Sequence, residues 1–339
     1  MDGEGGNAVG RPSPEGETFD LPSVLAQLDT QESAEQRAAV ETIRGALSDS
    51  PDACLPTVPK LRSLLEQPEL EYHETVAACL ADLASESPAD VAPSTDEIVA
   101  VAADRPDRPA TRELLRCLAN VAADRPAVVA EHAETIAEVL EQRQGVTPEG
   151  LDLVQQLSID HPAAVEPAFH VLTDALATDP EAFGARALSP LGRLAHSETP
   201  LPTLEFLEDA MAVVDHDDDS LRNNAIGCLA DIAQHRPAAV EQATADITAA
   251  LEHDDPKTRA NATVVVARLA EHTGRIAEPA RESVLESLAD EHDRVRANAC
   301  VAIGHAGIET ATARLETLAR EDPDRSVRER ADWALNRIS

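Results

Sequence analysis

The sequence predicts an all-α protein, a right-handed solenoid of about eight stacked helix-turn-helix repeats with a period of about 37 residues. Apolar residues recur at helical spacing, and the same pattern returns along most of the chain. Residues 220–254 show it most clearly. Leu221 and Leu229 belong to one apolar stripe there, and a second helix is predicted to begin at Pro237. One helix pair cannot bury two such stripes, whereas stacked copies can, so the periodicity indicates a solenoid.

Three columns of residues keep their register over most of the chain. The first column begins the second helix of each repeat and contains Pro51, Pro88, Pro126, Pro162, Pro200, Pro237 and Gly274. Ten residues after each of these stand Leu61, Ile98, Ile136, Leu172, Ala210, Ile247 and Val284. The first helix has its own column of Leu80, Leu118, Val154, Leu191, Leu229, Val266, Ile303 and Leu335. Chance apolar residues would not hold three registers together.

The two ends of the chain depart from the repeat. Residues 1–18 are rich in Gly, Pro and Glu without periodicity, which predicts a disordered acidic tail. Residues 19–339 are predicted to form a single solenoid, opened by a short lead-in helix over 20–28. The first helix of a ninth unit, 326–338, ends the chain, and Trp333 is expected to cover the last exposed apolar stripe there.

Two repeats are irregular. In the second repeat, the second helix is expected to start late, after residues 88–96 (PADVAPSTD). The eighth repeat is shorter, with the turn GHAGIETAT between its helices. In the assembled stack we expect the second helices to line a concave face.

The charge balance is strongly acidic. Asp and Glu number 63 against 28 Lys and Arg, for a net charge of −35. Lys60 and Lys257 are the only lysines, and aromatic residues make up 2% of the chain. This composition resembles proteins of salt-accumulating halophilic archaea. Salt near 1 M shortens the electrostatic screening length to ~3 Å and so weakens the repulsion among surface acids. The acidic composition also argues against a nucleic-acid partner, because phosphate binding needs clustered Lys and Arg.

The composition also bears on location and redox state. There is no apolar run of about 18 residues and no signal-peptide pattern, so we expect a cytoplasmic protein without membrane insertion. An odd number of cysteines without CxxC pairs predicts reduced, structural thiols. These are Cys54, Cys79, Cys117, Cys228 and Cys300.

The turns that precede the first helices carry a family resemblance. An acidic turn is followed by the pattern Val/Leu-Arg-x-x-Ala, with Thr258 in place of Val or Leu in one copy, in DDDSLRNNA (217–225), DDPKTRANA (254–262), EHDRVRANA (291–299) and DPDRSVRERA (322–331). With this pattern the chain, over about residues 20–339, resembles HEAT-repeat proteins, and most closely the short HEAT-like repeats first described in phycobilisome lyases. The resemblance is specific for the fold and nearly silent on activity.

The resemblance implies a ladder between neighbouring repeats, in which turn acids pair with the following Arg. It carries over to Arg37, Arg222, Arg259, Arg296 and Arg328, with Asp217, Asp254, Glu291 and Asp322 as partners. His73, Thr111, Thr147 and Gly184 stand where Arg is expected, so the ladder should fail from repeat two to repeat five. A second column, Asn224, Asn261 and Asn298, is also interpreted as structural.

No catalytic or metal-binding signature stands out. Repeat periodicity accounts for the histidines at the ends of helices, such as His196, His235 and His272. Deoxyhypusine hydroxylase, a HEAT-like di-iron enzyme, uses several His-Glu pairs, and here only residues 73–74 match. We therefore predict no catalytic residue, no metal site and no cofactor. The alternative is a HEAT-repeat enzyme or enzyme subunit of a metal- or cofactor-using type, lyase-like or hydroxylase-like, and a nucleic-acid-binding solenoid ranks below it.

The favoured interpretation is a monomeric, non-enzymatic scaffold or adaptor that binds another protein along its concave helical face. Phe169, Phe183 and Phe206 fall in repeats four and five, where the Arg column is missing. They are either packing filler for an irregular joint or an aromatic contact patch for the partner.

Overall fold

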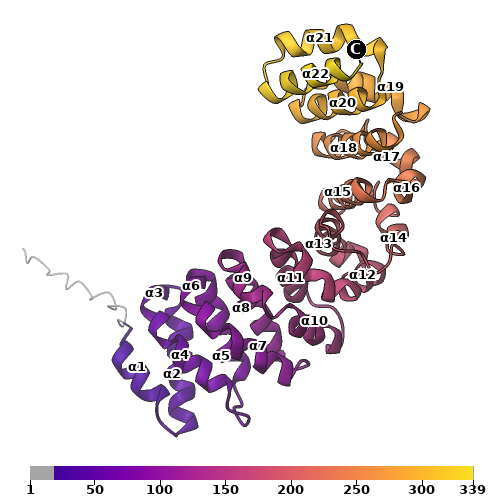
Figure 1. Ribbon diagram of the computed structural model, residues 1–339. Helices are drawn as coiled ribbons and strands as arrows, with labels where there is room; N and C mark the ends of the chain where they lie inside the picture. The colour runs from indigo at the N-terminus through magenta and orange to yellow at the C-terminus, as the bar shows by residue number, and fades with distance from the viewer. Residues whose placement is uncertain (1–18, 339) are drawn as a thin grey trace, which may run out of the picture.

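A computed structural model describes residues 19–338, and the whole of its regular structure is helical. The helices stack into an elongated, curved solenoid (Figure 1). This confirms the all-α solenoid predicted from the periodicity. The predicted tail, 1–18, lies outside the described residues.

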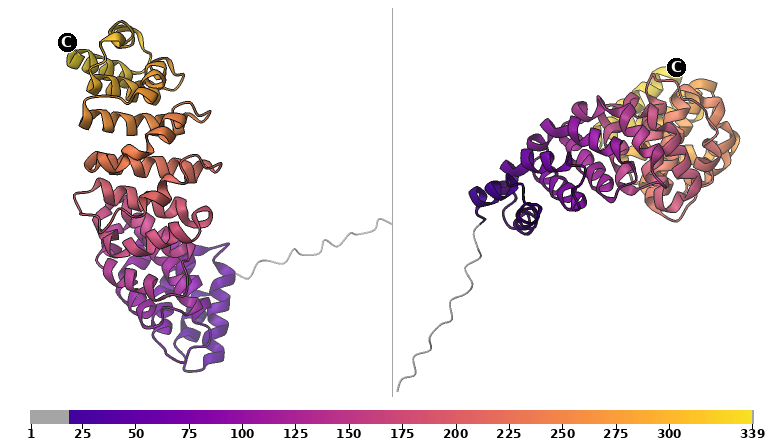
Figure 2. Two further views of the ribbon diagram at one scale, coloured as in Figure 1. Left: turned by 90° about the vertical axis from the view of Figure 1, so that its right-hand side faces the viewer. Right: turned by 90° about the horizontal axis from the view of Figure 1, so that it is seen from below.

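The first helices of the repeats form one continuous layer in which each packs against the next. They are α2 (Ser33–Ala46), α5 (His73–Glu86), α8 (Pro109–Asp124), α11 (Pro148–Asp160), α13 (Ala185–His196), α15 (Asp219–His235), α18 (Pro256–Thr273), α20 (Asp293–Ala306) and α22 (Arg325–Ile338). Successive members of this layer lie like rungs in the C-terminal part of the stack (Figure 2).

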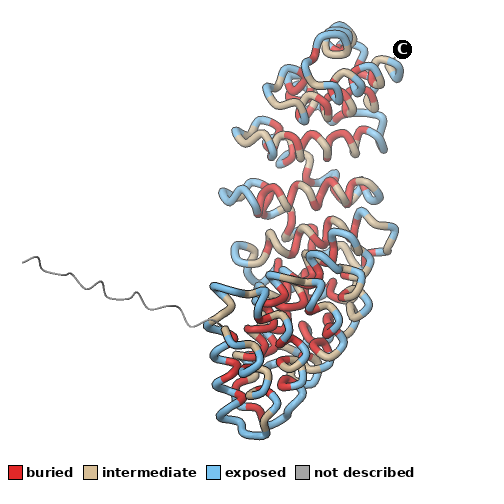
Figure 3. Tube along the Cα trace, turned by 90° about the vertical axis from the view of Figure 1, so that its left-hand side faces the viewer, coloured by how far each residue is buried: buried red, intermediate tan, exposed pale blue. Residues whose placement is uncertain are grey.

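The second helices form the other layer. They are α4 (Val58–Leu65), α7 (Thr95–Asp104), α10 (Ala133–Gln142), α12 (Phe169–Thr178), α14 (Leu207–Met211), α17 (Thr244–Ala250), α19 (Glu278–Glu286) and α21 (Thr312–Glu321). The apolar core lies between the two layers and is built mainly from Ala, Val, Leu and Ile (Figure 3).

The proline column marks a different position from the one predicted. Pro51, Pro88, Pro126 and Pro237 each begin a separate short helix: α3 (Pro51–Cys54), α6 (Pro88–Val91), α9 (Pro126–Ala130) and α16 (Pro237–Val240). Pro162 begins the 3₁₀-helix η3 (Pro162–Ala168). In these five repeats the long second helix starts seven residues after the proline. A further proline without an N–H to donate falls in the break in three of them, at Pro56, Pro93 and Pro167.

From α13 onward, the first helices, and not the second, lie on the inner side of the bend (Figure 1). The expectation that second helices line the concave face is therefore wrong for this part of the stack. Neighbouring first helices pack far more closely than neighbouring second helices do. Glycines permit this approach: a Cβ on Gly304 would lie 2.9 Å from Ala334 Cα, and one on Gly192 would lie 3.0 Å from Cys228 Cα. The closer-packed layer takes the inside of the curve.

Distinct features stand at the two ends of the described stack, and the covering role expected of Trp333 stays a prediction because its side chain is half-buried. Helix α1 (Leu21–Leu28) begins at the N-cap Asp20 and buries Val24 and Leu28, as the predicted lead-in helix should. At the other end, the Trp333 ring packs over Gly304 and lies 4.9 Å from the His305 ring, centroid to centroid.

The joint between repeats four and five is irregular. Pro200 begins no helix, α14 has 5 residues, and the π-helix η4 (Pro180–Gly184) precedes α13. Phe169 and Phe206 meet edge to face at 5.8 Å and are only 1% and 3% exposed. These two side chains fill the joint, so the folded chain cannot offer them to a partner. Phe183 is half-buried, and its role as a contact stays a prediction.

Candidate functional site

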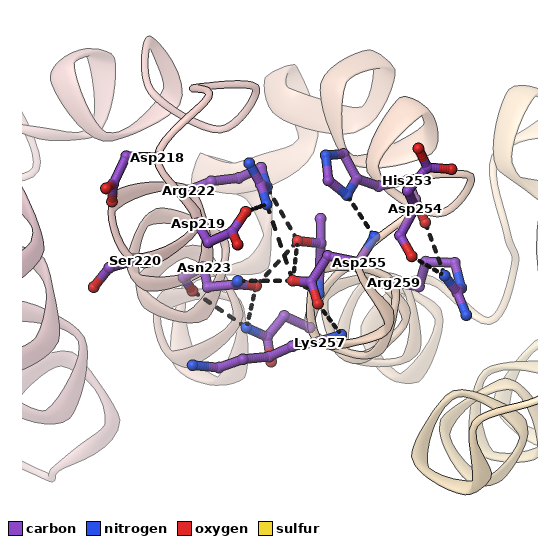
Figure 4. Close-up of polar contacts among 12 residues, drawn as sticks. Asp218, Asp219, Ser220, Arg222, Asn223, His253, Asp254, Asp255, Lys257 and Arg259 are labelled. Carbon is purple, nitrogen blue, oxygen red and sulfur yellow. Dashed lines mark hydrogen bonds and ion pairs between the residues drawn. The ribbon is translucent and has the colours of Figure 1, made fainter.

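The C-terminal repeats bury a row of charged side chains where one turn stacks on the next. Each turn precedes a first helix, and the first turn of that helix carries the Arg of the predicted ladder. Arg222 is 2% exposed and lies among polar side chains of two repeats (Figure 4). Burying a guanidinium this deeply is tolerable only if its donors are used.

Arg222 is held within its own repeat and across to the following one. Its Nη1 donates to the carbonyl oxygen of His216 at 2.7 Å, its Nη2 pairs with Asp219, and its Nε donates to Thr258 Oγ1 at 3.1 Å. Asn223 Nδ2 donates to Asp255 at 3.0 Å and so ties the same two repeats together.

Asp255 is the acceptor at the centre of this network. Burial opposes its ionisation, but hydrogen bonds from Asn223, from Thr258 and from the backbone N–H of Lys257 outweigh that effect and hold the Asp255 pKa far below its usual range. The carboxylate is therefore charged and fully engaged as an acceptor. It also caps α18 (Figure 4).

The next two arginines make bidentate bridges to the following turn. Arg259 donates from Nε and Nη2 to Asp290 at 2.7 and 3.0 Å, and Arg296 donates likewise to Asp322 at 2.8 and 2.9 Å. Burial opposes the ionisation of both carboxylates, but these bonds hold the pKa of each below its ordinary value. Such paired, charge-assisted bonds fix both distance and orientation between repeats.

The partners of the ladder differ in part from the predicted set. The backbone carbonyls of Asp217, Asp254 and Glu291 accept hydrogen bonds from the ladder arginines. These three residues therefore hold the arginines mainly through the main chain of the turn. The bridging carboxylates of Asp255 and Asp290 were missed. Arg328 donates to the carbonyls of Asp322 and Pro323 within its own turn.

Arg37 does not belong to this ladder, because its side chain is exposed. Ile43 is the buried counterpart of Leu80, which places Gln36, one residue earlier than Arg37, at the ladder position. The Gln36 amide is 8% exposed and donates to the carbonyls of Thr30 at 2.8 Å and Leu28 at 3.3 Å. A neutral amide thus performs there the task of the guanidinium. Aligning Ile43 with Leu80 in the sequence would have placed Gln36 at the ladder position.

The middle repeats join their turns by other means. Thr111 donates from Oγ1 to the carbonyl of Arg105 at 2.7 Å, while Arg105 itself reaches back to the carbonyl of Pro68 at 3.1 Å. Arg143 reaches back to the carbonyl of Pro106 in the same way. No bidentate Arg–Asp bridge of the C-terminal kind occurs among the described turns before residue 216.

The asparagine column also joins repeats. Asn261 Nδ2 donates to the carbonyl of Asn223 at 3.2 Å, and Asn298 Nδ2 donates to the carbonyl of Ala260 at 3.1 Å. Each therefore bonds to the backbone of the preceding first helix. Asn224 instead donates to the carbonyl of Ser220 in its own helix, at 2.9 Å.

The chemistry available at these groups is limited. Within residues 19–338, no three His, Cys, Asp or Glu side chains gather closely enough to hold a metal ion. All five cysteines are buried free thiols. Burial raises the pKa of Cys79, Cys117 and Cys300 to about 12, which keeps them protonated and poor nucleophiles near neutral pH. The hydrogen-bond donors around the ladder carboxylates keep them ionised. These carboxylates are therefore better suited to holding neighbouring repeats together than to transferring protons.

The exposed side of the first-helix layer forms a continuous surface, because successive first helices pack side by side, and we call it the inner face. Each first helix contributes four positions at helical spacing (i, i+4, i+7 and i+11). In α18 they are Lys257, Asn261, Val264 and Arg268, and none of these four is fully buried. From α13 onward, the helices that carry this surface lie on the concave side of the bend (Figure 1).

Comparison with known proteins places the fold. Residues 244–336 match the family model for HEAT repeats. The structure resembles the crystal structure of an engineered protein, with a TM-score of 0.78, 18% sequence identity, and coverage of 94% of this chain and 88% of that chain. It also resembles a chain solved in work on a phosphorylation switch that controls the interaction between cadherin and beta-catenin, with a TM-score of 0.72, 13% identity, and coverage of 94% and 72%. No curated protein matches the chain.

One further geometric finding concerns membranes. Among the described helices, none combines the length and the apolar composition needed to cross a bilayer.

The match over residues 244–336, together with a solenoid fold shared over most of the chain, supports a HEAT-repeat protein.

Proposed function

We propose that this protein is a non-enzymatic scaffold or adaptor that binds a partner protein along its inner face. The observation that supports this most is the extent of that face, which runs over nine successive first helices. Such a long, shallow surface suits an extended or helical protein segment better than a small molecule. The solved chain from the cadherin and beta-catenin work shares the solenoid fold, although its low identity carries over no partner.

Photo-crosslinking tests this proposal. A photoreactive amino acid replaces Val301 on the inner face, and the control variant carries it at Glu282, which is exposed on the second-helix layer. After irradiation in native lysate at molar KCl, we expect discrete cross-linked proteins from position 301 and none of these from position 282. Equal cross-linking at both positions, or none at 301, contradicts the proposal. Stoichiometric iron or zinc in the purified protein would favour the metal-enzyme alternative.

We further infer that the chain is a monomeric, cytoplasmic protein adapted to molar salt, with repeats of the phycobilisome-lyase type. The net charge of −35 and the scarcity of lysine support the adaptation to salt. In dilute buffer these acids repel one another, because the screening length rises from ~3 Å at 1 M to ~30 Å at 0.01 M. Helical circular dichroism should therefore fall as KCl is dialysed away. Unchanged helicity and melting temperature in millimolar salt contradict the inference.

A further inference from the structure

The inner face changes its charge halfway along the solenoid. In the first four repeats its positions hold six acids and one cation: Glu41, Glu71, Asp82, Glu113, Glu149, Asp152 and Arg116. In α13, α15, α18, α20 and α22 they hold seven cations and one acid: Arg186, Arg193, Lys257, Arg268, Arg294, Arg330, Arg337 and Asp231. A chain of net charge −35 thus carries a cationic strip on one part of one surface.

The cations of this strip are separate from the buried ladder. Lys257, Arg294, Arg330 and Arg337 are exposed, and Arg268 is partly exposed. Arg268 pairs with Glu271 at 3.3 Å on its own helix, a solvent-exposed contact that contributes little stability. Three of the seven donate to the preceding first helix: Arg186 to Asp152 at 2.6 Å, Arg193 to Ser158 at 2.9 Å and Arg330 to Asn298 at 2.7 Å. Stacking therefore accounts for the ladder arginines and for part of this set. It does not account for Lys257, Arg268, Arg294 and Arg337, whose side chains bond to no neighbouring repeat among the described residues.

Five of the second helices differ from the strip, whereas α4 carries cations, and α19 and α21 carry both acids and cations. Helices α7, α10, α12, α14 and α17 contain acids but no Lys or Arg. Within the inner face, the cations gather on the first helices from α13 to α22.

An apolar column runs beside the cations. Val264, Val301 and Trp333 occupy the same position in successive first helices, and all three are half-buried. The Arg337 guanidinium lies 5.1 Å from the centroid of the Trp333 ring. The strip can therefore offer apolar contact and anion-binding donors side by side.

Resting on the scaffold function proposed above, we infer that this strip binds an acidic, extended segment of a partner protein with apolar residues between its acids. Five helix axes spaced at about 8–10 Å span roughly 32–40 Å. An extended peptide of about 10–12 residues covers that span. A short segment suits the strip because the inner face becomes acidic beyond α13, where a long polyanion such as nucleic acid would be repelled.

The test is a binding titration with defined probes. Labelled peptides of about 12 residues, built from repeating Glu-Glu-Leu or Lys-Lys-Leu triplets, are compared with a thymidine oligonucleotide of similar length. Labelled-probe anisotropy reports affinity, and emission from Trp333, the chain's single tryptophan, reports binding at the strip. The measurements use the lowest salt at which circular dichroism shows the full chain folded, followed by stepwise addition of KCl.

We expect the acidic peptide to bind, to change Trp333 emission and to weaken as salt is added. The variant Arg294→Glu, Arg330→Glu should lose about tenfold or more in affinity for it. The matched control, Arg281→Glu, Arg320→Glu, makes the same charge change on α19 and α21 of the second-helix layer and should bind as wild type. The strip variant should in turn gain affinity for the Lys-Lys-Leu peptide.

Three outcomes overturn the inference: no binding of the acidic peptide, equal loss in both variants, or tighter binding of the oligonucleotide. The scaffold proposal is judged separately. Cross-linking from position 301 without binding of the acidic peptide rejects only the charge of the partner, whereas absence of cross-linking rejects the inner face as a docking surface.

Discussion

The C-terminal and middle repeats solve the same stacking problem with different chemistry. In the C-terminal repeats, Arg259 and Arg296 bridge their turns to an aspartate of the next turn, and only 11% and 3% of the Arg296 and Asp322 side chains are exposed. In the middle, Thr111 and Arg105 use backbone carbonyls, and Phe169 with Phe206 fills the joint. Similar packing of first helices therefore does not require similar side chains in the turns.

The difference also explains where the sequence remains recognisable. A bidentate Arg–Asp bridge needs one donor geometry, so the same residue types recur from turn to turn, and the HEAT-repeat match covers these repeats. Backbone carbonyls accept from almost any donor. The middle repeats can therefore vary in sequence without losing their place in the stack.

The largest effect is expected at the joint. Phe169→Ala should lower the free energy of unfolding by about 3–5 kcal/mol, because it removes a side chain that is buried against Phe206. Phe183→Ala, at a half-buried position, is the control and should cost clearly less. Urea unfolding at fixed high salt measures both. Equal losses would mean that the joint is not held by its aromatic contact.

The ladder should be the next most sensitive feature. Arg296→Met leaves the buried Asp322 carboxylate without its partner and should cost about 3 kcal/mol. Arg105→Met removes a hydrogen bond to a carbonyl and should cost about 1 kcal/mol. Hydrogen exchange shows which repeats lose protection. If the two variants lose the same stability, the contrast between the two regions has no energetic basis.

A smaller effect tests the close approach of the first helices. Gly304→Ala should destabilise the last repeat by about 1–3 kcal/mol, since its Cβ would lie 2.7 Å from the Trp333 ring. Gly227→Ala meets nothing within 4 Å in α15 and should instead stabilise by about 0.5–1 kcal/mol. Thermal melts at constant salt give the sign of each change. Destabilisation by both would indicate an effect of helix geometry instead of contact.

The mildest test is a pH titration. The pKa values of Asp290 and Asp322 are lowered in the folded chain, so their contribution is complete above the unfolded-state pKa of about 3.9 and disappears as pH falls through the folded values. Stability of the C-terminal repeats should thus be flat near neutrality and fall in acid. In Asp322→Asn this acid dependence should weaken. An unchanged acid profile in that variant would remove Asp322 as its source.

Much of the fold follows from local pattern. The helix pairs and the lead-in helix were readable because apolar periodicity and capping act over a few residues. The ladder register was readable wherever an acidic turn and Arg stood together. The predicted register was wrong in the first repeat, where Arg37 matches the residue type of the ladder. The residue that is buried at the ladder position is Gln36.

The sequence by itself determined the period, the two apolar stripes of each repeat and the arginines of the C-terminal turns. Only the tertiary structure decided which layer is concave, which carboxylate each arginine meets, and that Phe169 and Phe206 face each other in the core. The physical reason is range. Periodicity reports what one helix buries, whereas curvature and cross-repeat pairing depend on small differences in spacing between layers that accumulate over the whole stack.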